Sequence, residues 1–187
     1  MRRDETAMDK NQVNIAKERS LSLLLNASIP VTTVEADRIE IADFGLNDLT
    51  HIGLQLLTYV NTQRVCAKEL ILFPGQTCPE HFHPPHNGEP GKEETFRCRA
   101  GEVYLYVPGE ETGNPRAKIP NGFENYFTSK HEVILLPGDQ FTIFPGTPHW
   151  FQAGPAGAIV SEFSTRSTDE LDIFFDPRII RAPQIEK

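Results

Sequence analysis

Short apolar segments separated by turn residues fill the chain from residue 55 onward. Most of these segments are rich in β-branched or aromatic residues, and pairs such as Pro74-Gly75 and Pro137-Gly138 mark turns between them. Many short strands punctuated by glycine and proline are typical of an antiparallel sandwich or jelly-roll barrel. We therefore predict an all-β fold with strands near these ranges: 55–60, 66–73, 94–98, 102–107, 132–136, 140–144, 149–151 and 158–163.

The two ends of the chain have a different pattern. Residues 1–12 are polar without apolar periodicity, and we expect this end to be flexible. A helix is predicted from Gln12 to Ala27, because a proline soon after would end it. The charged tail, residues 169–187, carries two apolar clusters and is expected to pack across the barrel or against a partner subunit. These features predict one domain over residues 13–187, with the barrel core at 55–165 and helical segments near both ends.

Composition narrows the function classes. The chain has 187 residues, a length that suits one domain, and a formal charge of -8 from 18 basic and 26 acidic residues. Nucleic acids and anionic membranes attract positive patches, so neither is an expected partner. The N-terminus lacks the apolar core of a signal peptide, and no apolar run could span a bilayer. The three cysteines are a poor disulfide framework, and we expect a cytoplasmic protein.

Four residues have the spacing of a metal site. His81 and His83 lie two apart, so on a strand their imidazoles point to the same face. Glu94 follows eleven residues after His83, and His149 is embedded between later strand segments. Three nitrogens and one carboxylate oxygen suit a metal such as Mn, Fe, Co, Ni or Zn, and leave two octahedral positions for a substrate. The competing ligands are less favoured, because they lie on the opposite strand face or among turn and polar residues: Glu93, His51, His86 and His131.

These residues resemble the two sequence motifs of the cupin superfamily. The first motif reads G-x5-H-x-H-x3,4-E-x6-G, and its positions correspond to Gly75, His81, His83, Glu94 and Gly101, with an inserted loop before the glutamate. The second reads G-x5-P-x-G-x2-H-x3-N, and its glycines and histidine correspond to Gly138, Gly146 and His149, while Phe144 and Ala153 replace the proline and asparagine. The resemblance implies a cupin jelly-roll barrel in which the two motifs supply the four metal ligands.

Longer stretches resemble one branch of this superfamily more specifically. They are PGKEETFRCR at residues 90–99, YVNT at 59–62, CAKEL at 66–70 and VSEFST at 160–165. They are similar to the D-lyxose ketol-isomerase family, and the resemblance extends over residues 40–180. It implies an aldose–ketose isomerase that acts on D-lyxose and, less well, on D-mannose, and it implies a homodimer. The implied cofactor is one divalent metal ion, with Mn²⁺ first and Co, Ni, Zn or Fe as alternatives.

Isomerisation of an aldose moves hydrogen between C1 and C2, which requires a general base. A metal chelated by O1 and O2 would polarise the carbonyl and stabilise an enediolate. Glu162 is our first candidate for the base, because it lies on a late strand; the alternative is a surface carboxylate paired with a basic residue. Lys68, on the strand before the histidine pair, could donate to O1 or O2 or shuttle the proton; the alternative is an exposed strand lysine.

Further residues are candidates for contact with the sugar. By strand parity Phe96 shares the face of the glutamate ligand and would form a wall of the pocket. Tyr104 and Tyr106 alternate on one strand and could add hydroxyl groups, although such tyrosines are more often core residues. Asp172 and Arg178 on the tail could close the mouth of the pocket.

Three other functions fit the same ligands. An iron-dependent cupin dioxygenase would use the two open metal positions for O₂ and substrate, and a non-catalytic cupin would bind a sugar without turnover. A phosphosugar isomerase would need a basic phosphate site, for which Lys92, Arg97 and Arg99 are available, but parity puts both arginines opposite Glu94. Activity without oxygen would separate the isomerase from the dioxygenase.

Overall fold

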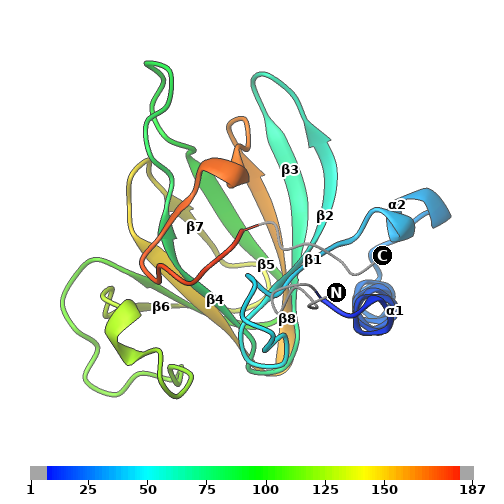
Figure 1. Cartoon of the computed structure of the whole chain (residues 1–187), viewed down its shortest axis with the longest axis horizontal. Coiled ribbons are helices and arrows are strands. Elements are labelled where there is room, and N and C mark those ends of the chain that lie inside the picture. Colours follow the sequence, from blue (N-terminus) through cyan, green and yellow to red (C-terminus); the bar gives the residue numbers. More distant parts are fainter. Residues whose placement is uncertain (1–7, 182–187) are drawn as a thin grey trace, which may run out of the picture.

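The computed structural model describes residues 8–181, which form a curled antiparallel sheet with a helix outside it (Figure 1). In chain order, its elements are α1 (Lys10–Asn26), α2 (Thr33–Asp37), β1 (Glu40–Ala42), β2 (Leu54–Asn61), β3 (Cys66–Leu72), β4 (Thr77–Phe82), β5 (Glu94–Val107), η1 (Glu124–Tyr126), β6 (His131–Leu135), β7 (Gln140–Ile143), β8 (His149–Ser164), η2 (Asp169–Leu171) and β9 (Ile173–Phe174), where η marks a short 3-10 helix. This arrangement confirms the all-β barrel prediction. None of the described helices is long and apolar enough to cross a membrane.

Two long strands, β5 and β8, hold the barrel together. β5 pairs with β6, β7 and β8, and the rest of the sheet runs in the order β1-β2-β3-β8-β4-β9. Register shifts between Cys98 and Ala100 and between Gly101 and Val103 interrupt the β5–β8 ladder, and such irregularities bend strands. Gly101 has a φ of +73°, and a Cβ there would lie 1.9 Å from the carbonyl oxygen of Gly157. Only glycine fits this close approach.

The inward faces of the strands change from apolar to polar along their length. Leu70 on β3 and Val160 on β8 are Cα partners and belong to the apolar cluster inside the barrel. Two residues further along, the same faces carry Lys68 and Glu162, which are also Cα partners. The barrel therefore has an apolar part and, next to it, a polar interior.

The N-terminal helix begins earlier than predicted. α1 starts at Lys10, and the side chain of Asp9 caps it by accepting hydrogen bonds from the N–H groups of Asn11 and Gln12. Met8 is buried in the apolar cluster between α1 and the sheet. Residues 8–12 therefore belong to the packed structure and not to the flexible end that we expected, while residues 1–7 lie outside the described part of the chain.

The chain after β8 crosses one end of the barrel. We call residues 165–181 the C-terminal strap, which is orange and red in Figure 1. Its strand β9 pairs with β4, so that Phe174 lies opposite His81. Near its end, the N–H of Ile180 donates a hydrogen bond to the carbonyl of Phe44. The prediction that the tail packs across the barrel is confirmed as far as residue 181.

Candidate metal centre and active site

Three histidines meet inside the barrel where β4 and β8 pair. His81 on β4 and His149 at the start of β8 are Cα partners, and His83 follows His81 by two residues. Each offers one ring nitrogen within 4.8 Å of those of the other two, and all three residues are buried. The structure thus brings together the three histidines that the sequence motifs indicate.

Hydrogen bonds fix which nitrogen of two of these rings is free. Nδ1 of His81 lies 2.8 Å from the carbonyl oxygen of Pro79, and Nδ1 of His149 lies 3.0 Å from that of Thr147. A carbonyl oxygen only accepts, so each Nδ1 carries the proton and the Nε2 of the neutral ring keeps its lone pair. Nε2 of His149 is buried and has no hydrogen-bond partner among the described residues. A metal ion would satisfy this atom.

The Glu94 carboxylate lies beside His83 and His149. Oε1 of Glu94 lies 3.2 Å from Nε2 of His83 and 3.0 Å from Nε2 of His149, the latter without hydrogen-bond geometry. Nδ1 of His83 lies 2.6 Å from the carboxylate of Asp172, and carboxylates in this position orient metal-binding imidazoles. The three nitrogens form a set that fits a divalent cation, and the Glu94 carboxylate lies beside two of them.

Burial and charge act differently on the pKa values of His81, His83 and Glu94. Burial lowers the pKa of His81 well below its usual value, and the other two histidines add to the effect. Burial alone would raise the pKa of Glu94, but the Lys92 ammonium, 2.7 Å away, outweighs it and holds that pKa well below the usual range. Burial lowers the pKa of His83, but Glu94 and Asp172 outweigh it and raise the value to about 9. A metal ion that binds His83 therefore displaces a proton.

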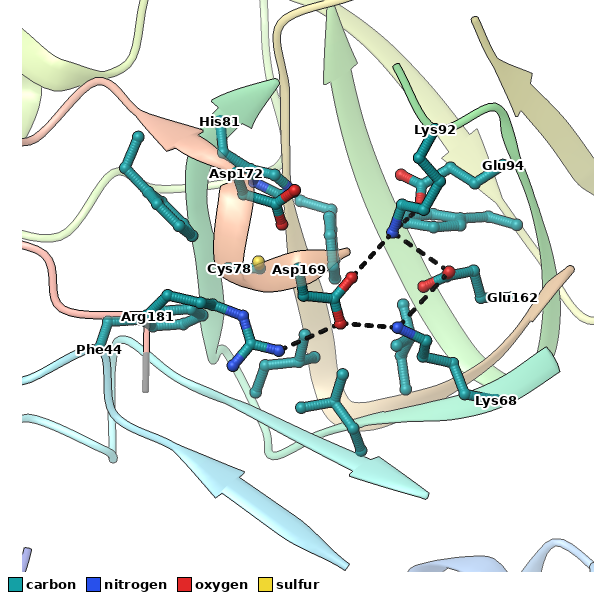
Figure 2. Close-up of a pocket in the computed structure, with 16 residues that line it drawn as sticks. Phe44, Lys68, Cys78, His81, Lys92, Glu94, Glu162, Asp169, Asp172 and Arg181 are labelled. Atoms are coloured by element: carbon teal, nitrogen blue, oxygen red, sulfur yellow. Dashed lines mark hydrogen bonds and ion pairs between the residues drawn. The ribbon is translucent and has the colours of Figure 1, made fainter. Parts of the chain in front are cut away.

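Two lysines and two carboxylates form a ring of alternating charges beside the histidines (Figure 2). Nζ of Lys92 lies 3.2 Å from Glu162 and 3.4 Å from Asp169, while Nζ of Lys68 lies 3.8 Å from Glu162 and 2.7 Å from Asp169. Lys68, Lys92 and Glu162 are buried, so neither Lys68 nor Glu162 is the exposed residue of the alternative interpretation. We call these four residues the charge ring.

The charges of this ring stabilise one another. Burial lowers the pKa of Lys68 and of Lys92, but the neighbouring carboxylates, Glu162 first, outweigh it and raise both. Burial would raise the pKa of Asp169, but Lys92, Lys68 and Arg181 hold it well below its usual value. Because desolvated charges persist only when they are paired, removing one member leaves an uncompensated buried charge.

Three residues of this site were not assigned to it from the sequence. Lys92 was considered only as a phosphate ligand, yet it precedes Glu94 by two residues, and the same parity that places Phe96 puts it on the inward face. Asp169 and Arg181 lie on the strap, where Nη2 of Arg181 is 3.2 Å from Asp169. No periodicity places an irregular segment against a barrel, so the sequence held no signal for these two residues.

His81, Glu94 and the charge ring line a cavity of about 30 Å³. Phe96 lines it and is 1% exposed, at the position that parity predicts. Asp172 lines it from the strap, and Phe174 stacks on His81 with ring centroids 5.1 Å apart. The competing ligands Glu93, His51, His86 and His131 are all exposed. The strap therefore forms one wall of the cavity, opposite the side chains that the barrel contributes.

The two tyrosines predicted to contact the sugar lie elsewhere. Tyr104 and Tyr106 belong to a separate cluster, in which Tyr106 stacks on Trp150 with centroids 3.9 Å apart. The register shifts in β5 change the parity between Phe96 and these residues, so that Leu105 packs in the barrel interior instead. This corrects the assignment of both tyrosines to the substrate site.

Three arginines considered for substrate binding also point away from the cavity. The Arg178 side chain is 49% exposed and pairs with Asp176 at 2.6 Å, which corrects its predicted position at the pocket mouth. Arg97 and Arg99 are exposed and make their hydrogen bonds at the outer face of the sheet, as parity predicts. None of the three lines the cavity, so they do not form a phosphate site there.

Fold and site together define a cupin whose buried histidines could hold a metal ion beside a small polar cavity. Comparison with known sequences identifies the family within this class. The chain belongs to the D-lyxose isomerase family, whose sequence profile matches residues 35–187. It is therefore a member of a family of sugar isomerases.

Individual relatives agree with this assignment. The chain is 62% identical over 179 residues to the D-lyxose/D-mannose isomerase of Thermosediminibacter oceani, covering 96% of this chain and 99% of the relative. It is 58% identical over 171 residues to the D-lyxose ketol-isomerase of Cohnella laeviribosi, covering 91% and 94%. The L-ribose isomerase of Acinetobacter sp. DL28, solved with L-ribose, superposes with a TM-score of 0.80 at 17% identity over 96% of this chain and 98% of that one. At this identity the structural likeness shows a shared fold.

Proposed function

We propose that this protein interconverts D-lyxose and D-xylulose and, as a second pair, D-mannose and D-fructose. The relatives named above support the substrates, and one of them carries both aldoses in its name. The observation that carries the proposal is the position of Glu162. It is a buried carboxylate between two lysines, and it lines the same cavity as Glu94 and His81.

We propose one divalent metal, Mn²⁺ first, held by His81, His83, Glu94 and His149. The convergent nitrogens and the unpartnered Nε2 of His149 support this set. Bound there, the ion would act as a Lewis acid on the carbonyl of the open-chain sugar. Asp172 would keep the ring of His83 oriented through its hydrogen bond to Nδ1.

The remaining steps belong to the side chains of the charge ring. Glu162 takes the proton from C2 of the aldose and returns it at C1, while the hydroxyl proton moves from O2 to O1. The ammonium groups of Lys68 and Lys92 lie 3.8 Å and 3.2 Å from Glu162 and can donate to the sugar oxygens between which this proton moves. Strap residues cover one side of the cavity, which limits the access of water to the reacting atoms.

We further propose a homodimer in the cytoplasm. Tyr59 and Phe163 are 43% and 51% exposed, and large exposed apolar side chains favour an interface. The three cysteines are buried and free, which is compatible with a reducing compartment. Sedimentation of the purified chain tests the dimer directly.

The deciding experiment is metal-dependent turnover without oxygen. The protein is stripped with a chelator, Mn²⁺ is restored, and ketose formation from D-lyxose is followed anaerobically. We expect activity only with metal, and a loss of roughly 10²–10⁴-fold in kcat for Glu162→Gln with metal content unchanged. The matched control is Glu93→Gln, an exposed neighbour of the ligand that should retain activity. No turnover of D-lyxose or D-mannose by the metal-loaded protein would refute the proposal, and dependence on O₂ would favour a dioxygenase.

A further inference from the structure

A second, larger cavity lies next to the active-site cavity. It measures about 250 Å³, against about 30 Å³ for the first. Glu40 and Thr58 line it and are exposed, so the second cavity opens to solvent. Three residues line both cavities: Lys68, Asp169 and Arg181. These three side chains are the partition between the two spaces.

The partition is held by ion pairs between side chains. Asp169 lies 2.7 Å from Nζ of Lys68 and 3.2 Å from Nη2 of Arg181, and Figure 2 shows it between them. The other end of the guanidinium lies 2.6 Å from the carboxylate of Glu40, which is half exposed. Lysine and arginine have long flexible stems, and Asp169 and Arg181 belong to the strap and not to the barrel. Rotation of these groups would join the cavities without a change in the sheet.

The active-site cavity alone is too small for a sugar. A space of about 30 Å³ admits two or three water molecules, whereas small-molecule sites measure about 300–1,000 Å³. The reacting carbons must lie beside the histidines and Glu162, so the rest of the sugar extends away from them. In Figure 2, His81, Lys92 and Glu94 lie in the upper part of the view, while Lys68 and Arg181 lie lower, on either side of Asp169. The distal carbons therefore point toward the partition.

We infer that the second cavity is a subsite for the distal end of the substrate, reached through the Lys68–Asp169–Arg181 partition. D-mannose has the configuration of D-lyxose at C2 to C4 and one more carbon, so its terminal hydroxymethyl group enters this subsite. Thr58, Asn61 and Ser167 line the space. The Ser167 hydroxyl already bonds Lys68 and Asp169, so a sugar hydroxyl would meet the Thr58 hydroxyl and the second N–H of the Asn61 amide, whose first N–H donates to the Ser167 carbonyl. The subsite thus sets the preference between pentoses and hexoses; this inference rests on the proposed isomerase function.

The test changes the size of the subsite and compares two sugars. Thr58→Trp fills the second cavity from an exposed position and should lower kcat/KM for D-mannose roughly tenfold relative to D-lyxose. Arg181→Ala widens the partition and should raise the same ratio by a similar factor. Arg178→Ala removes an arginine of the same strap that lines neither cavity, and should leave the ratio within about twofold.

Binding without turnover gives an independent readout. D-arabinitol and D-mannitol are the reduced, unreactive forms of D-lyxose and D-mannose, and calorimetry measures their affinity for the metal-loaded protein. The affinity ratio should shift in the same direction as the kinetic ratio for each variant. Equal effects on both sugars and both alditols would overturn the subsite, while continued turnover of D-lyxose would leave the isomerase standing. If the unmodified protein turned over neither sugar, the isomerase would fail and the alditol ratio alone would decide the inference.

Discussion

At the scale of single residues, hydrogen bonds within the protein determine which polar atoms of the site are available to a ligand. His81 and His149 use Nδ1 on backbone carbonyls, so their Nε2 lone pairs are available to a cation. Tyr106 shows the opposite case. Its hydroxyl donates to Glu132 and accepts from the N–H of Ala117, so both capacities are used outside the cavity. The hydrogen bonds of a side chain thus show whether its polar atoms are used within the fold or are available to a ligand.

These hydrogen bonds predict that Tyr106→Phe lowers the stability of the protein but not its catalytic activity. The substitution leaves a buried N–H and the Glu132 carboxylate without this partner, which should lower the free energy of unfolding by about 1–3 kcal/mol. The value of kcat/KM for D-lyxose should stay within about twofold, since Tyr106 does not line the cavity. Denaturant unfolding and steady-state kinetics measure the two effects. A tenfold loss of activity in a folded variant would contradict this prediction and indicate that Tyr106 contributes to substrate binding or catalysis.

At the scale of elements, β5 shows where the sequence pattern is informative and where it stops. Alternation predicts the inward positions of Glu94 and Phe96, at the start of the strand, and the structure agrees. The same alternation fails at Tyr104 and Tyr106, because two register shifts lie between. A bulge depends on the partner strand as well as on its own residues, so the period of β5 alone cannot locate it.

The bend in β5 gives the second prediction. Gly101→Ala would require a positive φ of a non-glycine residue and place its Cβ 1.9 Å from a backbone oxygen of β8. We expect the free energy of unfolding to fall by more than about 2 kcal/mol, measured by thermal or denaturant unfolding. Gly113→Ala is the matched control, because a Cβ there meets nothing within 4 Å. Equal stability of the two variants would show that the close approach to Gly157 is dispensable.

The strap gives the third prediction, through Asp172. This carboxylate orients His83, and outer partners of this kind typically change metal affinity by about 10–100-fold. Asp172→Ala should therefore weaken Mn²⁺ binding by that factor, and Asp172→Asn, which can still accept the hydrogen bond, should weaken it less. Titration of the chelator-treated protein with Mn²⁺ measures both constants. Unchanged affinity in both variants would mean that the strap has no part in holding the metal.

At the scale of the whole molecule, the site combines local and distant parts of the chain, and the two differ in how well they can be predicted. His81, His83 and Glu94 lie close together in sequence, so their spacing and the cupin motifs indicate the metal centre. Asp169 and Arg181 reach the site only because the strap crosses the barrel, where Phe174 stacks on His81 and the N–H of Ile180 bonds the carbonyl of Phe44. The charge ring is therefore a property of the folded chain.

The metal centre also joins distant parts of the chain, so its ligand should stabilise the whole fold. His83 and His149 come from segments far apart in sequence, and the unfolded chain holds no such set. At 100 times its dissociation constant, a ligand specific for the native state adds about 2.7 kcal/mol, which for 187 residues is a rise of about 5–11 °C in Tm. Thermal unfolding in chelator and in graded Mn²⁺ measures this shift. His149→Ala should remove it, whereas His131→Ala, at an exposed histidine, should retain it. A Tm independent of Mn²⁺ in the unmodified chain would mean that the proposed ligands His81, His83, Glu94 and His149 do not bind that ion. The fold would then be stable without the metal on which the proposed chemistry depends.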